Sequence, residues 1–199
     1  MFIICSDLEG VFVPEVWINV ADKTGIEELR RTTRDEPDYD KLMHYRMKIL
    51  DEHGLKLNDI QDVIAQIKPL PGAVEFIQWI KERTQLIVVS DTFRQFAEPL
   101  MIQLGRPTLF CHDLEMDETN RITGYKLRQI DPKRKTVEAL QSLTYKVIAF
   151  GDSYNDISML KKADVGILFC PPQNVIDDHP ELPVTYDYET LKEILKKYI

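Results

Sequence analysis

The segment Phe2-Ile-Ile-Cys-Ser-Asp-Leu-Glu-Gly-Val-Phe12 decides the fold of this chain. Its first residues predict a short buried strand, and the carboxylates of Asp7 and Glu9 follow at once. A strand that ends in paired acids and a glycine presents those acids at the edge of a sheet, where a nucleophile or a metal ion would lie. The alternative is a solvated turn in which Gly10 supplies a positive φ.

Length and charge limit the classes of protein to consider. A chain of 199 residues can form one sizeable core, or a core domain with one insertion. The formal net charge is −8, which makes nonspecific binding to nucleic acid or to an anionic membrane a poor hypothesis. No window approaches 18 apolar residues, and the N-terminus lacks the basic start of a signal peptide. We expect neither nucleic acid nor a membrane as a partner.

The cysteines point to a reducing compartment. Cys5, Cys111 and Cys170 are widely spaced and form no CxxC pair, which argues against a disulfide framework and against a zinc site. Each lies in or beside an apolar run that predicts a strand. We therefore expect buried reduced thiols and a cytoplasmic protein.

Residues 13–71 predict a small helical insertion. Pro14 can begin a helix that Gly25 ends, and Asp38 or Asp40 can cap a longer amphipathic helix closed by Gly54. A further helix is predicted over 57–67, and a Pro/Gly hinge follows it at 68–72. The expected domains are therefore a core of residues 1–12 and 72–199 and a helical cap of residues 13–71.

After Gly72 the pattern alternates between helices and strands. The predicted strands are 86–90, 108–112, 145–150 and 165–169, with a hairpin over 114–128. The predicted helices are 73–83, 93–104, 132–143, 153–162 and 188–197, with a short one near residue 174. This alternation predicts right-handed βαβ units and an α/β fold, a doubly wound, Rossmann-like parallel sheet. Ligands of such sheets bind beyond the carboxyl ends of the strands.

Polar segments follow these strands. Ser90-Asp-Thr92 follows one strand, and Gly151-Asp-Ser-Tyr-Asn-Asp156 follows another. Acids of this kind hold a divalent cation, and a hydroxyl donates to a phosphate. Both segments also suit helix capping, since Ser90-Asp-Thr92 precedes a predicted helix and Ser153-x-x-Asp156 has the spacing of a capping box.

The segment Asp131-Pro-Lys-Arg-Lys135 opens a helix with cations in its first turn. Asp131 can be the N-cap and Pro132 the first helical residue. Cations at this place oppose the helix dipole by about 0.3–1 kcal/mol each, and a bound anion near Lys133 would offset that cost. The alternatives are solvated surface cations, or a small nucleic-acid patch with Lys126 and Arg128 that the overall acidity disfavours.

Together and in this order, the four segments resemble the motifs of the haloacid dehalogenase superfamily of phosphotransferases. The matches are Asp7-Leu-Glu-Gly-Val11, Ser90, Lys133 and Gly151-Asp-Ser-Tyr-Asn-Asp156. The helical insertion resembles the cap of that superfamily's first class, which places the chain near the phosphoserine phosphatases. The resemblance covers the full length of the chain.

The resemblance implies that Asp7 attacks a phosphomonoester and forms an aspartyl phosphate. It implies a Mg²⁺ cofactor, with Asp7 and Asp152 as metal ligands and Glu9 contributing its backbone carbonyl. Asp156 would hold metal-bound water or Lys133. Glu9 would also act as general acid for the leaving alkoxide and then as base for the acceptor.

The resemblance also implies a phosphate site and a substrate site. Ser90 and the backbone N–H of Asp91 would bind phosphate oxygens, and Lys133 would offset the charge of the phosphoryl group in the transition state. In the cap, Glu15 and Arg46 would bind the amino and carboxylate groups of phosphoserine, although a solvated arginine is the alternative for Arg46. Asn155 is a further candidate for substrate contact.

The sequence departs from the usual motifs at several places. Glu9 stands where the superfamily has aspartate, Ser90-Asp-Thr92 stands where typical phosphoserine phosphatases have Ser-Gly-Gly, and Glu15 is one residue closer to Asp7 than is typical. These departures resemble a bacterial subgroup, the ThrH-type proteins, which also transfer the phosphoryl group from phosphoserine to homoserine. The chemical alternatives are a phosphatase for another small phosphomonoester and a catalytically inactive binding module. The histidines show no ligand spacing and are interpreted as structural or surface residues: His44, His53, His112 and His179.

Overall fold

A computed structural model describes residues 1–32, 35–36 and 38–199. The strands are β1 (Phe2–Ser6), β2 (Leu86–Phe93), β3 (Thr108–Met116), β4 (Ile122–Lys126), β5 (Lys146–Gly151), β6 (Val165–Phe169) and β7 (Val184–Thr185). The helices are α1 (Val16–Thr24), α2 (Tyr39–Glu52), α3 (Leu57–Ile64), α4 (Ala73–Lys81), α5 (Arg94–Gln103), α6 (Pro132–Ser142), α7 (Ile157–Lys162), α8 (Gln173–Asp178) and α9 (Tyr188–Leu195), with 3-10 turns at Glu27–Arg30 and Tyr154–Asp156.

The strands form a single sheet in the order β4-β3-β2-β1-β5-β6-β7. β1 pairs in parallel with β2 and β5, and the parallel pairing continues to β3 on one side and to β6 and β7 on the other. β4 pairs with β3 in antiparallel fashion, as the predicted hairpin requires. The strand order reverses at β1, so the end of β1 is the place where such a sheet binds its ligands.

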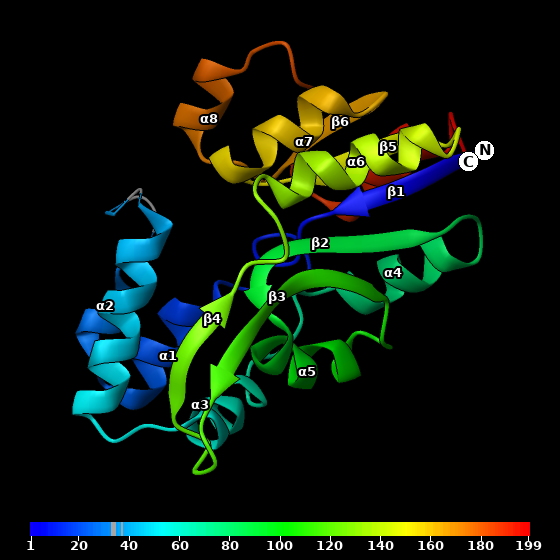
Figure 1. Ribbon diagram of the computed structural model, residues 1–199. Helices are drawn as coiled ribbons and strands as arrows, with labels where there is room; N and C mark the ends of the chain where they lie inside the picture. Colours follow the sequence, from blue (N-terminus) through cyan, green and yellow to red (C-terminus); the bar gives the residue numbers. More distant parts are fainter. Residues whose placement is uncertain (33–34, 37) are drawn as a thin grey trace.

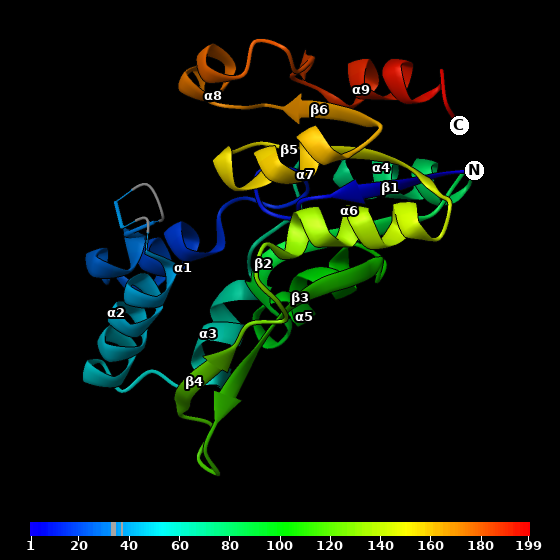
Figure 2. The same cartoon turned by 45° about the horizontal axis from the view of Figure 1, so that its top comes forward.

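Side chains of alternate residues enter two cores, one on each face of the sheet. Ile4 packs into the larger core with Phe76 and Leu191, whereas Ile3 and Cys5 pack into the other. Figure 1 shows α6 and α7 in front of the sheet and α4 behind it, and the rotated view in Figure 2 shows the same layers. This arrangement confirms the predicted doubly wound α/β fold.

Helices α1, α2 and α3 follow β1 and precede α4, as predicted, and they lie to one side of the sheet (Figure 1). α1 ends at Gly25, whose φ is 71° and whose N–H donates to the carbonyl of Ala21. α2 is capped by Asp38, whose carboxylate accepts from the N–H groups of Asp40 and Lys41. The division into a core of 1–12 and 72–199 and a cap of 13–71 stays a prediction.

The β3–β4 hairpin contacts the helical insertion. The N–H of Leu57 donates to the carbonyl of Asn120 at 3.0 Å, and Arg121 donates to both oxygens of Asp51. The hydroxyl of Tyr125 contacts the carboxylate of Asp40 in α2. The hairpin therefore braces the insertion against the sheet. Among the described residues, no helix is both long and apolar enough to cross a membrane.

Some details differ from the sequence predictions. β2 continues past Ser90 to Phe93, and β7 was not predicted because two residues carry no periodicity. Cys5 is buried as expected, but Cys111 is only half-buried and Cys170 is exposed. The prediction of buried thiols was therefore wrong for the last two: Cys111 lies in β3, and Cys170 lies in the bend that follows β6.

Candidate active site

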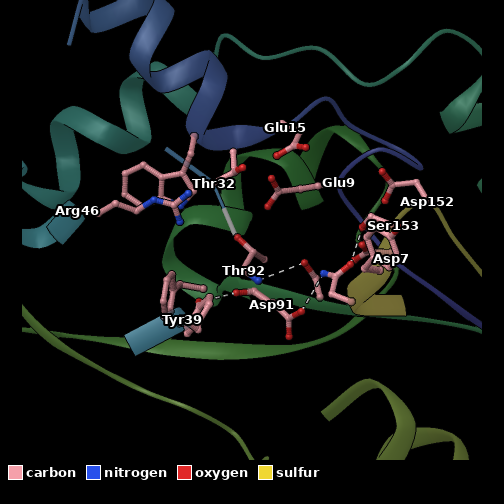
Figure 3. Close-up of a pocket in the computed structure, with 15 residues that line it drawn as sticks. Asp7, Glu9, Glu15, Thr32, Tyr39, Arg46, Asp91, Thr92, Asp152 and Ser153 are labelled. Atoms are coloured by element: carbon pink, nitrogen blue, oxygen red, sulfur yellow. Dashed lines mark hydrogen bonds between the residues drawn. The ribbon is translucent and has the colours of Figure 1, made fainter. Parts of the chain in front are cut away.

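A pocket of about 220 Å³ opens at the carboxyl ends of β1, β2 and β5. Its walls come from the sheet and from the helical insertion: Asp7, Glu9, Glu15, Trp17, Thr32, Tyr39, Arg46, Ser90, Asp91, Thr92, Phe93, Asp152, Ser153, Tyr154 and Asn155. Figure 3 shows Asp7 and Asp152 on one side of the pocket and Arg46 and Tyr39 on the other, with Glu9 and Thr92 between them. The predicted site residues line this pocket, apart from Lys133 and Asp156, which contact each other, and Lys133 also contacts Asp7.

Asp7 is held at the end of β1. Its side chain is buried, Oδ1 accepts from the N–H of Leu8 at 2.8 Å, and Oδ2 lies 2.9 Å from Nζ of Lys133. Burial raises the pKa of Asp7 well above its usual range, and the charge of Asp156 adds to this effect while Lys133 opposes it. A fixed carboxylate beside an ammonium group is suited to attack at an electrophilic centre.

Lys133 turns inward from the first turn of α6. Only 1% of it is exposed, and Nζ lies 2.7 Å from Asp156, 2.9 Å from Asp7 and 3.6 Å from Asp91. Burial alone would lower the pKa of Lys133, but these carboxylates more than offset it, and the pKa is raised well above its usual range. The interpretation of Lys133 as a solvated surface cation is therefore wrong, whereas Arg134 does pair at the surface, with Asp131 and Glu138.

The carboxylates of Asp7, Asp152 and Asp156 have oxygens within 4.8 Å of one another. Burial, followed by the charge of Asp156, raises the pKa of Asp152 to about 7. Carboxylates crowded in this way repel one another, and hard oxygen ligands are those that Mg²⁺ prefers. The donor set therefore fits a divalent cation. The predicted contribution of the Glu9 backbone carbonyl stays a prediction.

Asp156 supports both Lys133 and the loop after β5. Oδ1 accepts from Nζ of Lys133, and Oδ2 accepts from the N–H groups of Asp152 and Ser153 at 3.0 and 3.2 Å. The contact with Ser153 is the one that a capping box requires. The capping and the functional interpretations of this segment are thus compatible, and of the two roles considered for Asp156 the geometry favours holding Lys133.

Glycines make room for these carboxylates. Gly10 has φ of 73°, and a Cβ at this position would lie 2.5 Å from Cγ of Asp152. A Cβ on Gly151 would lie 2.3 Å from Cγ of Asp156. Gly10 therefore both permits the turn and makes room for Asp152. The interpretation of the opening segment as a turn and its interpretation as a functional site are compatible.

The segment after Val89 offers donors for an anion. Ser90 is buried, and its Oγ accepts from the N–H of Thr92 at 3.2 Å, which leaves its O–H as a donor. The Asp91 carboxylate lies near Lys133 and accepts from Nδ2 of Asn155 at 3.1 Å. Burial alone would raise the pKa of Asp91. The charge of Lys133 and the hydrogen-bond donors around the Asp91 carboxylate outweigh burial and hold the pKa of Asp91 well below its usual range.

Glu9 joins the strand end to the helical insertion. Its Oε2 accepts from the N–H of Val16, the first residue of α1, at 2.8 Å. Burial raises the pKa of Glu9 to about 7, and the hydrogen bond from Val16 opposes that rise. A carboxyl group with a pKa near neutrality can both give and accept a proton under physiological conditions.

Arg46 brings a buried cation to the other side of the pocket. It is 6% exposed, its guanidinium lies 4.4 Å from the ring centroid of Trp17, and one terminal nitrogen donates to the carbonyl of Arg31 at 2.8 Å. Its Nε has no hydrogen-bond partner among the described residues. Burial lowers the pKa of Arg46 to about 10, while Tyr39 and Glu9 oppose the shift, so the group stays charged at neutral pH. The solvated alternative for Arg46 is wrong.

Other residues at the site were not found from the sequence. The hydroxyl of Tyr39 donates to the carbonyl of Asp91 at 3.0 Å, and Nε2 of the buried His112 lies 3.6 Å from Oδ1 of Asp91. The ring of Trp17 packs against the guanidinium of Arg46. Aromatic and histidine side chains carry no motif spacing here, and only the pairing of β2 with β3 brings His112 beside Asp91.

Comparisons with known proteins agree with this geometry. A sequence model of haloacid dehalogenase-like hydrolases matches residues 9–164. The chain is 61% identical over 197 residues to the phosphoserine phosphatase ThrH of Pseudomonas aeruginosa, covering 98% of this chain and 96% of that protein. It is 60% identical to a phosphoserine phosphatase of Pseudomonas syringae pathovar tomato, covering 96% of this chain and 81% of that one.

A solved structure described as a phospho-aspartyl intermediate analogue of phosphoserine phosphatase superimposes with a TM-score of 0.77 at 24% identity. The match covers 98% of this chain and 97% of that one, which supports the fold. These findings confirm the resemblance predicted from the four motifs. The chain is therefore an enzyme of the haloacid dehalogenase-like hydrolase family, in the group that includes the two Pseudomonas phosphoserine phosphatases.

Proposed function

We propose that this enzyme hydrolyses O-phosphoserine through an aspartyl phosphate on Asp7 and also transfers the phosphoryl group to homoserine. The observation that carries the proposal is that one pocket joins the Asp7–Lys133 pair to the buried guanidinium of Arg46. The Asp7–Lys133 pair suits a phosphoryl group, and the guanidinium of Arg46 suits a carboxylate some distance away on the same small molecule. Relatives at about 60% identity bear the name phosphoserine phosphatase.

In the first step, a carboxylate oxygen of Asp7 attacks phosphorus, and the bond between phosphorus and the serine oxygen breaks. Glu9 gives its proton to the departing serine oxygen. In the second step, Glu9 takes a proton from water or from the homoserine hydroxyl, whose oxygen attacks phosphorus and releases the Asp7 carboxylate. Glu9 ends each cycle protonated again.

Other groups hold the phosphoryl oxygens during both steps. The hydroxyl of Ser90 and the N–H of Asp91 donate to them, and Lys133 offsets their charge. The carboxylates of Asp7 and Asp152 and the Glu9 carbonyl would hold Mg²⁺, which would supply the positive charge that lets a carboxylate approach a phosphate dianion.

The helical side of the pocket selects the amino acid. Arg46 binds the substrate carboxylate, for which its Nε, which has no partner in the described part of the chain, is a ready donor, and Glu15 binds the ammonium group. Asn155, whose side-chain amide donates to the Asp91 carboxylate, also contacts the substrate. Homoserine carries the same head group with one more methylene, so these side chains can hold donor and acceptor in turn. A cytoplasmic location is part of the proposal, supported by cysteines that are all free in the described chain.

The proposed substrate is tested by Arg46→Ala with two substrates. Loss of a buried charge partner costs about 2–5 kcal/mol, so we expect kcat/KM for phosphoserine to fall at least about 30-fold. An aryl phosphate that lacks the head group should react within about threefold of the wild-type rate. Arg83→Ala is the matched control, because Arg83 also lies over an aromatic ring, that of Trp79, but outside the pocket. Phosphoserine turnover that survives Arg46→Ala contradicts the amino acid assignment.

The acceptor is tested by incubating the enzyme with phosphoserine, Mg²⁺ and increasing homoserine. We expect phosphohomoserine to rise as free phosphate falls, because both acceptors compete for the same aspartyl phosphate. Steady phosphate release without phosphohomoserine would limit the activity to hydrolysis.

A further inference from the structure

Lys133 has an additional carboxylate neighbour that the proposed chemistry does not require. Besides Asp7 and Asp156, the carboxylate of Asp91 lies 3.6 Å from Nζ. An extra negative charge beside a phosphate site repels the dianion and competes for the lysine. The position of Asp91 must therefore be fixed if Lys133 is to face the phosphoryl group.

His112 is placed to fix Asp91. Its Nε2 lies 3.6 Å from Oδ1 of Asp91, while Oδ2 accepts from Nδ2 of Asn155. His112 is 3% exposed, and its ring packs against Tyr39 and Phe93 at centroid distances of 6.3 and 6.2 Å. The imidazole therefore has little room to turn away from Asp91.

The backbone defines which nitrogen of His112 carries the proton. The N–H of Arg128 donates to Nδ1 of His112 at 3.1 Å, so Nδ1 is an acceptor. In the neutral ring the proton then lies on Nε2, the nitrogen that faces Asp91. An N–H on Nε2, 3.6 Å from Oδ1, attracts the carboxylate electrostatically and favours its charged form, although this distance is longer than a direct hydrogen bond.

The same segment also fixes the helix that carries Lys133. The guanidinium of Arg128 donates to the carbonyl of Pro132 at 3.2 Å and to Oγ1 of Thr136 at 2.9 Å, both in α6. Arg128 thus contacts His112 through its backbone and the first turns of α6 through its side chain. Arg128 therefore helps to position both Asp91, through His112, and Lys133, through α6.

From this arrangement we infer that His112 is a positioning residue: by presenting the N–H of Nε2 to Asp91 at 3.6 Å, it keeps that carboxylate in place and leaves Lys133 aligned between Asp7 and the phosphoryl group. The inference rests on the proposed function only for the identity of the phosphoryl donor. It predicts an effect on the phosphoryl half of the site, and hence the same effect with phosphoserine and with an aryl phosphate.

The variants are His112→Leu, which removes the donor, and His112→Gln, whose amide N–H can take the place of Nε2–H. We expect His112→Leu to lower kcat at least about 10-fold with both substrates and to weaken inhibition by inorganic phosphate, with a smaller change in KM. His112→Gln should recover most of the activity. His53→Leu, at an exposed position after α2, is the control and should leave both kinetic constants unchanged.

The path through Asp91 is tested by a double-mutant cycle. In an Asp91→Asn background, His112→Leu should change kcat by less than about threefold, because the charge that His112 holds is gone. Full, independent losses from the two substitutions would overturn the inference. So would a loss confined to phosphoserine, since that would place His112 in head-group binding.

A spectroscopic measurement keeps the test independent of the folding of the leucine variant. The ¹⁵N spectrum of the wild-type enzyme should show His112 as a neutral ring protonated on Nε2, and protonation on Nδ1 would overturn the inference. Failure of the proposed function can be distinguished from failure of this inference. If the proposed function is wrong, the wild-type enzyme will not turn over phosphoserine, whereas aryl phosphate turnover will still report the effect of the His112 variants.

Discussion

Replacing Gly10 with alanine should impair the active site without unfolding the protein. A Cβ on Gly10 would lie 2.5 Å from Cγ and Oδ2 of Asp152 and 2.8 Å from Oδ1. Carbon atoms of this kind need about 3.5 Å, so the Asp152 carboxylate must move by about 1 Å. Gly10 also has φ of 73°, a conformation that costs a residue with a Cβ about 1–2 kcal/mol.

These two effects have different sizes and different readouts. For a chain of this length, about 1–2 kcal/mol lowers the midpoint of thermal unfolding by about 2–8 °C. A 1 Å misplacement of a functional group costs about 100-fold in rate. We therefore expect kcat/KM to fall about 100-fold and the Mg²⁺ concentration for half-maximal activity to rise, while the protein stays folded at 25 °C.

Gly25→Ala is the matched control. Gly25 has φ of 71°, but no atom of the described residues lies within 4 Å of a Cβ at that position. Its substitution should lower the unfolding midpoint by a similar amount and leave activity and Mg²⁺ dependence unchanged. The assay is circular dichroism melting together with phosphate release over a Mg²⁺ titration. Equal activity of the two variants would refute the assignment of Asp152 to the metal site.

Three further predictions follow from the structure. Burial raises the pKa of Glu9 and of Asp152 to about 7, so the folded metal-free protein binds protons more tightly than the unfolded chain. Its thermal unfolding midpoint should therefore fall as the pH rises from about 5 to about 8. A midpoint that rises over this range would contradict the buried placement of these carboxyls. Glu9→Asp shortens the side chain that reaches Val16, so phosphorus NMR at a fixed homoserine concentration should show a lower ratio of phosphohomoserine to free phosphate, whereas an unchanged ratio would remove Glu9 from the choice of acceptor. Phe76 is fully buried and stacks on Tyr188 at 4.7 Å, so Phe76→Ala should lower the free energy of unfolding by about 3–5 kcal/mol in urea titrations, and a loss below about 1 kcal/mol would contradict the packing described for this core.

The fold could be predicted because its signals are local and repeated. The run Leu86–Ser90 is apolar and β-branched, Gly25 ends a helix in the left-handed conformation, and residues 114–128 have the pattern of a hairpin. Parallel sheets bring the ends of successive strands together, so Asp7 and Asp152 could be expected at one edge. The helix-dipole argument flagged all the cations in the first turn of α6, and the resemblance to the family motifs singled out Lys133 among them.

The rest of the site depends on contacts between segments that no local pattern encodes. Tyr39 reaches the carbonyl of Asp91, which is 52 residues away, only because the helical insertion folds over the sheet. His112 meets Asp91 through the pairing of β2 with β3, and a lone histidine in an apolar strand carries no signal of that neighbour. The burial of Arg46 likewise depends on Trp17, whose ring covers its guanidinium.

The central claim is that Asp7 becomes phosphorylated, and acid quenching during turnover tests it most directly. The enzyme is mixed with phosphoserine that carries a labelled phosphoryl group, stopped with acid within the first turnover and digested for mass spectrometry. We predict label on the peptide that contains Asp7, removable by hydroxylamine, and none on the Asp7→Asn variant, which should also release no phosphate. Turnover of phosphoserine by Asp7→Asn, or label on a different residue of the wild-type enzyme, would contradict the account.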